Sequence, residues 1–122
     1  MNNQYWGYEL ILDCAGCHVP SIQSRDNVYN WIKHLIRAID MEPIGEPHIE
    51  YTAAEFPDKA GFTAIQIIVT SSIVAHFIDS TGELYLNVFS CKEFDNDVVI
   101  KSVEDAFLAK KIRINFLTRQ AG

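Results

Sequence analysis

Three apolar runs between residues 60 and 91, separated by short polar breaks, constrain the fold most strongly. The first run, 61–71, alternates as a strand, and both of its faces are largely apolar. One face carries Thr63, Ile65, Ile67, Val69 and Ser71. A strand that is apolar on both sides predicts a sheet covered twice, by helices on one face and by another sheet on the other.

The other two runs predict a hairpin. Residues 72–79 and 83–91 form two strands joined by Ser80, Thr81 and Gly82, where the glycine allows the positive φ of a tight turn. This hairpin returns Cys91 toward Ser71. Three further segments, 5–14, 48–56 and 111–118, also have the composition or alternation of strands.

Two segments have the period of an amphipathic helix. Between residues 24 and 41, apolar side chains recur at helical spacing, namely Val28, Trp31, Ile32, Leu35, Ile36 and Ile39. Ser24 or Asp26 can cap this helix, and Pro43 and Gly45 end it. A second helix, capped by Asp95 or Asp97, buries a shorter stripe of Val99, Val103, Ala106 and Phe107.

The order β, α, β, β, β, β, α, β with mostly hairpin connections predicts an α+β two-layer sandwich with a mostly antiparallel sheet. A chain of 122 residues with 48% apolar and 21% charged residues suits one globular domain over 1–122. The predicted sheet places Thr63, Ser71, His76 and Cys91 among apolar side chains, so these four are the candidates for chemistry.

Charge and composition exclude several classes of partner. The chain has a formal charge of −6 with its ten Lys and Arg scattered, so it lacks the basic surface that binds nucleic acid. No apolar run reaches the ~18 to 20 residues of a membrane span, and the first residues do not read as a secretory signal. We expect a cytoplasmic protein whose three cysteines are reduced.

The string Cys14-Ala15-Gly16-Cys17-His18 is typical of haem attachment, of a zinc half-site or of a redox motif. Haem attachment requires export, zinc requires a second ligand pair, and a thioredoxin-like motif requires a βαβ context. We therefore interpret these as small residues in a strand-to-helix loop and predict neither metal nor haem.

The central block resembles the small bacterial and archaeal S-adenosylmethionine decarboxylase proenzymes, pyruvoyl-dependent lyases of polyamine and spermidine biosynthesis. The family pattern runs Gly, aliphatic, Ser, Gly, then Glu-Ser-His-x-x-x-His-Thr-Trp-Pro-Glu, then Asp-Val-Phe-Thr-Cys. Here residues 61–64 read Gly-Phe-Thr-Ala, 70–76 read Thr-Ser-Ser-Ile-Val-Ala-His, and 87–91 read Asn-Val-Phe-Ser-Cys. No gap is needed, and the similarity runs almost end to end.

The resemblance implies a role for each candidate residue. Ser71 would attack the Thr70 carbonyl in an autocatalytic cleavage of this zymogen, and would become the pyruvoyl group that forms a Schiff base with the substrate amine. His76 matches the processing base, since an imidazole exchanges protons near neutral pH. Thr63 matches the hydroxyl that hydrogen-bonds the processing intermediates, and Cys91 matches the proton donor of the decarboxylation.

The chain departs from the family pattern at four places. Thr70 replaces a glutamate at the bond to be cleaved, and Ser72 replaces a histidine. The five-residue interval to His76 favours Ser71 over Ser72 as the nucleophile. Residues 77–80 read Phe-Ile-Asp-Ser where the family has Thr-Trp-Pro-Glu, so the glutamate that holds the substrate's ribose is missing. Asp79 and Glu83 are the nearest replacements, and Asn87 replaces the aspartate before Val-Phe.

Two functions follow as hypotheses. The first is a self-processing decarboxylase acting on S-adenosylmethionine or on a smaller amino acid such as ornithine or arginine. The second is an uncleaved, non-catalytic binding or regulatory homologue that keeps the fold. Taken singly, such Ser, Thr, His and Cys residues are more often structural. The family also implies a homodimer with an αββα arrangement, in which the site is completed at the interface.

Overall fold

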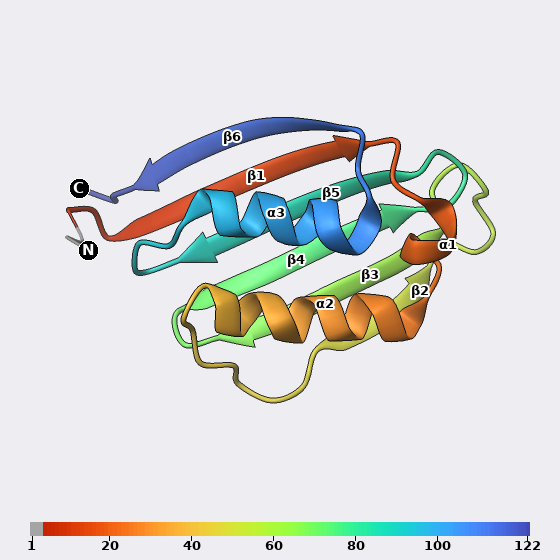
Figure 1. The fold of residues 1–122 in the computed structure, drawn as a ribbon. Helices are drawn as coiled ribbons and strands as arrows, with labels where there is room; N and C mark the ends of the chain where they lie inside the picture. The colour runs from red at the N-terminus through yellow and green to blue at the C-terminus, as the bar shows by residue number, and fades with distance from the viewer. Residues whose placement is uncertain (1–3) are drawn as a thin grey trace.

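The computed structural model describes residues 4–122, in which a six-stranded antiparallel sheet is covered on one face by helices (Figure 1). The strand order across the sheet is β2-β3-β4-β5-β1-β6. The strands are β1 (Gly7–Ala15), β2 (His48–Thr52), β3 (Gly61–Ile68), β4 (Ser71–Ile78), β5 (Glu83–Ser90) and β6 (Lys111–Arg119). The helices are α1 (Val19–Ile22), α2 (Arg25–Ala38) and α3 (Asn96–Phe107). The predicted α+β sandwich with an antiparallel sheet is confirmed.

The apolar stripes of α2 and α3 form the core against the sheet. Ser24 accepts a hydrogen bond from the Asn27 amide at 3.1 Å and caps α2, while Asp95 caps α3. The Trp31 ring contacts Phe77 of β4 and Phe107 of α3 edge to face, with ring centroids 6.1 and 5.1 Å apart. The six side chains predicted for the α2 stripe are all buried.

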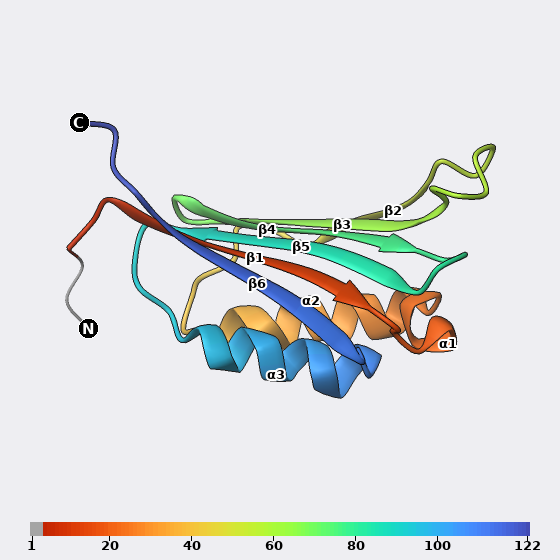
Figure 2. The ribbon, with the colours of Figure 1, turned by 90° about the horizontal axis from the view of Figure 1, so that it is seen from above.

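The opposite face of the sheet carries no helix. All three helices lie on one side of the sheet in Figure 2, and on the other side only the C-terminal end and the loop between β2 and β3 rise above the strands. Ile65 and Ile67 point to this side and are 39% and 59% exposed, and Leu117 of β6 is 47% exposed. The sequence predicted helices on one face and a sheet on the other, and one chain by itself provides only the helices.

The ends of two strands and one added helix are the main differences from the prediction. β2 ends at Thr52 rather than at residue 56, and β3 ends at Ile68 rather than at residue 71. The order also gains α1, a single turn around Pro20 that is too short to show helical periodicity. Alternation could not locate the end of β3, because the turn residues Val69 and Thr70 continue the apolar and β-branched pattern of the strand.

None of the helices in residues 4–122 has both the length and the apolar character needed to cross a bilayer.

Candidate active site

Ser71 and Cys91 lie together at one end of the sheet. Ser71 begins β4, and the Cys91 thiol, one residue beyond β5, lies 4.0 Å from the Ser71 hydroxyl. The Ser71 hydroxyl also donates to the Val69 carbonyl at 3.1 Å and accepts the Cys91 amide at 3.3 Å. The hairpin between β4 and β5 therefore brings Cys91 to Ser71, as the sequence predicted.

The turn before Ser71 is strained. Thr70 has a φ of 48°, in the left-handed region that β-branched residues rarely occupy. The turn is held from the side by the segment that follows α2, since the Ile44 amide donates to the Ile67 carbonyl at 2.9 Å and the Val69 amide to the Glu42 carbonyl at 3.4 Å. This bracing keeps the Thr70–Ser71 peptide bond in a conformation that its own residues disfavour.

A cavity opens beside this pair. It has a volume of about 270 Å³ and is bounded by Ser71 and Cys91, by the turn, and by the segment after α2 that includes Asp40 and Glu42. The Lys92 ammonium, also in its wall, lies 3.9 Å from the Asp40 carboxylate. A small molecule entering here would contact the Ser71 hydroxyl and the Cys91 thiol directly.

Thr63 and His76 form a second pair on the bare face of the sheet. They are cross-strand neighbours on β3 and β4, and the Thr63 hydroxyl lies 3.0 Å from His76 Nδ1. Thr52 of β2 extends the chain of contacts, with its hydroxyl 3.2 Å from that of Thr63. The sequence predicted both residues as candidates, and the register makes them direct partners.

The two pairs are far apart in one chain, which corrects the expectation that Thr63 and Ser71 share a face. Because β3 stops at Ile68, Ser71 pairs with Ile68 and points to the helix side, whereas Thr63 pairs with His76 and points away from the helices. His76 lies five positions after Ser71 on β4, which is roughly 16 Å at ~3.3 Å per residue. His76 therefore cannot reach Ser71 of its own chain.

Asp79 and Glu83, the predicted substrate carboxylates, have different surroundings. Asp79 accepts a hydrogen bond from the Tyr51 hydroxyl at 2.7 Å, and its other oxygen is enclosed without a partner. The carboxylate raises the pKa of Tyr51 through this hydrogen bond. Glu83 lies on the bare face and accepts from Thr81 at 2.7 Å and from Tyr85. Asp79 is thus engaged within the fold, while Glu83 faces the side of His76.

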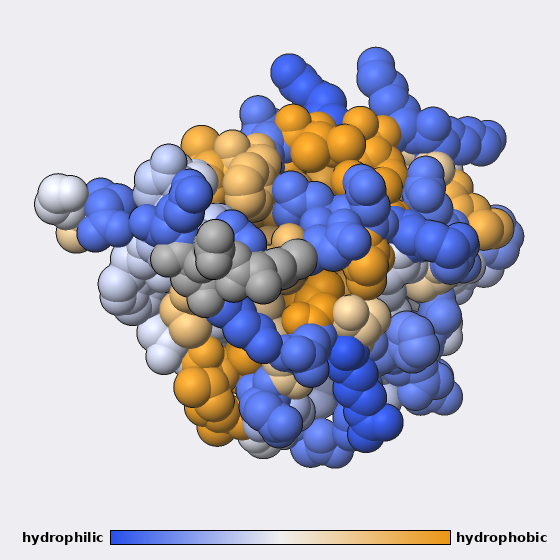
Figure 3. Space-filling view, turned by 60° about the vertical axis from the view of Figure 1, so that its left-hand side comes forward, coloured by the Kyte–Doolittle hydropathy of each residue, from blue (hydrophilic) through white to orange (hydrophobic). Residues whose placement is uncertain are grey.

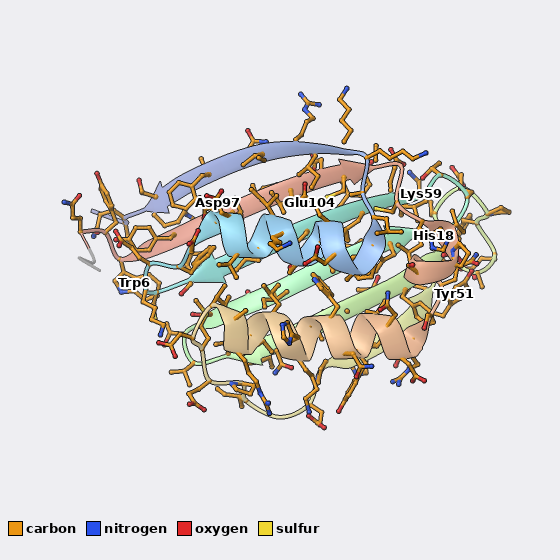
Figure 4. The ribbon with its side chains drawn as sticks, viewed as in Figure 1. Trp6, His18, Tyr51, Lys59, Asp97 and Glu104 are labelled. Carbon is orange, nitrogen blue, oxygen red and sulfur yellow. The ribbon has the colours of Figure 1, made fainter. Side chains whose placement is uncertain are left out.

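An aromatic shelf adjoins the Ser71 end on the bare face. Phe89 is the cross-strand neighbour of Ser72, and the Trp6 ring stacks on Phe89 with centroids 6.1 Å apart. The Arg119 guanidinium lies over the Phe89 ring, 5.4 Å from its centroid. Trp6, Phe89 and Arg119 border a cavity of about 400 Å³. Trp6 and Tyr51 mark opposite ends of the sheet in Figure 4. Figure 3 looks toward the end that carries the termini and shows separate apolar patches between hydrophilic side chains.

The cysteines of the C-x-x-C-H string are buried thiols. Cys14 belongs to β1 and Cys17 to the connection to α1, so only part of the string is a loop. Burial raises the pKa of Cys14 to about 12 and that of Cys17 to about 11, and for Cys14 the neighbouring Cys17 and Asp13 add to the rise. Within residues 4–122 no three His, Cys, Asp or Glu side chains gather as a metal site.

Sequence reasoning missed Ser90 and Thr52. Ser90 is fully buried, and its hydroxyl lies 3.4 Å from that of Ser71 and accepts the Lys92 amide at 3.0 Å. Its place directly before Cys91 was the signal that could have identified it. Thr52 lies outside every motif, and only the β2–β3 register brings it to Thr63.

Comparison with known proteins gives consistent relatives. The family model described as S-adenosylmethionine decarboxylase matches residues 8–120. The S-adenosylmethionine decarboxylase proenzymes of Clostridium botulinum strains Langeland and Hall are each 23% identical over 117 residues, covering 95% of this chain and 96% of theirs. The crystal structure of the adenosylmethionine decarboxylase from Aquifex aeolicus superposes with a TM-score of 0.79 at 14% identity, over 97% of this chain and 93% of that one. At that identity the match shows the fold.

Proposed function

The chain belongs to the S-adenosylmethionine decarboxylase family, and we propose that it is a self-processing proenzyme that cleaves between Thr70 and Ser71 and then acts as a pyruvoyl-dependent decarboxylase. The observation that carries the proposal is the arrangement of Thr70, Ser71 and Cys91 at one end of the sheet. A hydroxyl that follows a strained residue has a thiol within 4.0 Å, at the positions the family pattern predicts.

The proposed cleavage uses groups of the chain and water. The Ser71 hydroxyl attacks the Thr70 carbonyl carbon, the Thr70–Ser71 amide bond breaks, and an ester forms with a free amine on residue 71. Removal of the Ser71 α-proton by a base expels the Thr70 carboxylate, and hydrolysis of the resulting enamine releases ammonia. Release of the left-handed Thr70 conformation favours the first step, because the strain is lost when the turn opens.

The surroundings of residue 71 fit a pyruvoyl group. The Cys91 amide, which donates to the Ser71 hydroxyl at 3.3 Å, and the Ser90 hydroxyl would hold the group, and the Cys91 thiol would deliver a proton beside it. A pyruvoyl group supplies an electrophilic carbonyl that withdraws electrons while carbon dioxide is lost.

The decisive measurement is the intact mass of the purified chain beside Ser71→Ala and Ser72→Ala. We expect fragments 1–70 and 71–122, with cleavage lost only in Ser71→Ala. Loss only in Ser72→Ala would move the site by one residue. A wild-type chain that stays intact after long incubation would favour the alternative, a non-catalytic homologue, for which the replaced Glu and His at positions 70 and 72 are the supporting observation.

We also propose that a second copy completes the site. His76 matches the family's processing base but lies roughly 16 Å from Ser71 along β4, at ~3.3 Å per residue. If two bare faces pack with a two-fold axis running across the strands, the Ser71 end of one copy meets the Thr63–His76 pair of the other. The exposed Ile65 and Ile67 then become buried in an αββα dimer.

Mixing two inactive variants tests this arrangement. Ser71→Ala has no nucleophile and His76→Ala has no base, so neither should cleave alone. After mixing through partial denaturation and refolding, the His76→Ala chains should cleave, since their partners supply His76. A mixture that stays intact, or a wild type that sediments as a monomer at micromolar concentration, would contradict the composite site.

The substrate proposed is S-adenosylmethionine or a smaller amino acid. The Trp6–Phe89 shelf offers a surface on which a purine could stack, whereas the missing ribose glutamate removes a charged hydrogen bond worth on the order of 1.5 to 3 kcal/mol. Carbon dioxide release should be measured in parallel from S-adenosylmethionine, ornithine, arginine and lysine. Trp6→Ala should reduce turnover of S-adenosylmethionine selectively, and equal losses on all four would argue against stacking.

A further inference from the structure

A second cluster of charged side chains lies on the bare face, away from Ser71. It is formed where β5, β1 and β6 run side by side, and it lines a cavity of about 210 Å³. Two acids, Asp13 and Glu83, and two bases, Lys111 and Arg113, border this cavity together with Tyr85. The strand register places them on the same face, since Asp13 pairs with Tyr85 on one side and with Arg113 on the other.

These charges do not neutralise one another by contact. Asp13 and Arg113 are directly opposite on adjacent strands, yet none of the ion pairs within 4.0 Å found in residues 4–122 includes any of the four charged groups. The same two strands close a pair elsewhere, between Arg119 and Glu9. The cluster is therefore an open arrangement of opposite charges around a hollow.

The acidic side of the hollow is held in place. Glu83 accepts a hydrogen bond from Thr81 at 2.7 Å and another from the Tyr85 hydroxyl, and Asp13 is half-buried. The hydrogen bond to Glu83 is the main cause that raises the pKa of Tyr85, followed by desolvation and by the charges of Glu83 and Asp13, so the phenol acts as a proton donor to the carboxylate. Fixed acceptors reduce the entropy that a bound cation would otherwise lose in ordering them.

We propose that this cavity binds a small zwitterion of the α-amino acid class, with its ammonium group on Asp13 and Glu83 and its carboxylate on Lys111 and Arg113. Carboxylate and guanidinium groups pair strongly, and an ammonium group takes up to three acceptors. The volume is below the ~300 Å³ at which pockets for drug-sized ligands begin, which limits the occupant to a small molecule. The site requires no cleavage at Ser71 and is independent of the proposed decarboxylase.

The cavity also lies where a second copy would cover least. β1 and β6 turn away from the plane of β3, β4 and β5 in Figure 2, so this corner of the face curves away from a sheet stacked on the central strands. A ligand could enter from the rim while the centre of the face is buried.

The test is binding of L-alanine to the full Ser71→Ala chain, followed by amide chemical shifts. L-alanine should shift the amides around residues 13, 83–85 and 111–113. Propionate lacks the ammonium group and ethylamine lacks the carboxylate, so each should bind about tenfold more weakly or worse. Equal binding of either analogue would overturn the zwitterion assignment, and the absence of any shift with L-alanine would overturn the site.

Two variants separate the two halves of the cluster. Arg113→Gln should weaken L-alanine binding about tenfold while ethylamine binding is unchanged. Glu83→Gln should also weaken L-alanine binding about tenfold, while propionate binding is unchanged. Lys101→Gln on α3 removes a charge on the far side of the molecule and serves as the matched control. Unchanged L-alanine affinity in both Arg113→Gln and Glu83→Gln would refute the proposal. A folded spectrum for each variant establishes that the comparison is valid.

Discussion

The left-handed Thr70 gives the most specific prediction, because the same backbone strain should lower the stability of the folded chain and speed its cleavage. Thr70 holds a φ of 48°. This conformation costs a residue other than glycine about 1 to 2 kcal/mol of folding free energy, and it does not cost glycine this amount. Glycine in turn costs about 0.5 to 1 kcal/mol of extra chain entropy on folding. Thr70→Gly should therefore stabilise the folded chain by about 0.5 to 1 kcal/mol in total.

The stability assay is urea unfolding in a Ser71→Ala background, where cleavage cannot interfere. The midpoint should rise while the slope stays constant, since the exposed surface is unchanged. Ser80→Gly is the matched control, because Ser80 lies in the β4–β5 turn and has no positive φ. That control should lose about 0.5 to 1 kcal/mol. Equal losses in both variants would refute the strain argument.

Cleavage tests the functional half of the reasoning. If opening of the turn releases about 1 to 2 kcal/mol in the transition state, Thr70→Gly with an intact Ser71 should cleave about 5- to 30-fold more slowly than wild type. The rate is read from intact masses over time. Cleavage at the wild-type rate, or faster, would show that the turn's strain is not used in the reaction.

Three further predictions follow from particular contacts. A Cβ added at Gly61 would lie 1.8 Å from the Phe77 carbonyl oxygen, so Gly61→Ala should destabilise the chain by about 2 to 3 kcal/mol in urea unfolding. A loss of stability smaller than that of Ser80→Gly would contradict the register of β3 on β4. Raised thiol pKa values near 12 and 11 leave Cys14 and Cys17 almost entirely protonated at pH 8, so iodoacetamide should modify the half-exposed Cys91 first, which peptide mass spectrometry can check. Because Asp79 raises the pKa of Tyr51, Asp79→Asn should move one tyrosine titration to lower pH in ultraviolet absorbance, and an unchanged titration curve would deny the hydrogen bond.

Local patterns in the sequence were sufficient for most of the elements. Helical spacing identified α2 and α3, because one face of each must be apolar to cover a sheet. Alternation and turn residues identified the strands and the β4–β5 hairpin, where Gly82 has the predicted positive φ of 72°. The same patterns, with the family spacing, named Ser71, Cys91, Thr63 and His76 before any contact was known.

Only the tertiary structure decided where those residues lie relative to one another. A strand has a period of two, so ending β3 at Ile68 instead of residue 71 moved Ser71 to the helix side and left Thr63 on the bare face. The placement of Val69 and Thr70 in a turn depends on the segment after α2 that braces it, and that contact joins residues far apart in the chain. The sequence by itself singled out the four candidate residues, while long-range pairing decided that they divide into two pairs at opposite ends of the sheet.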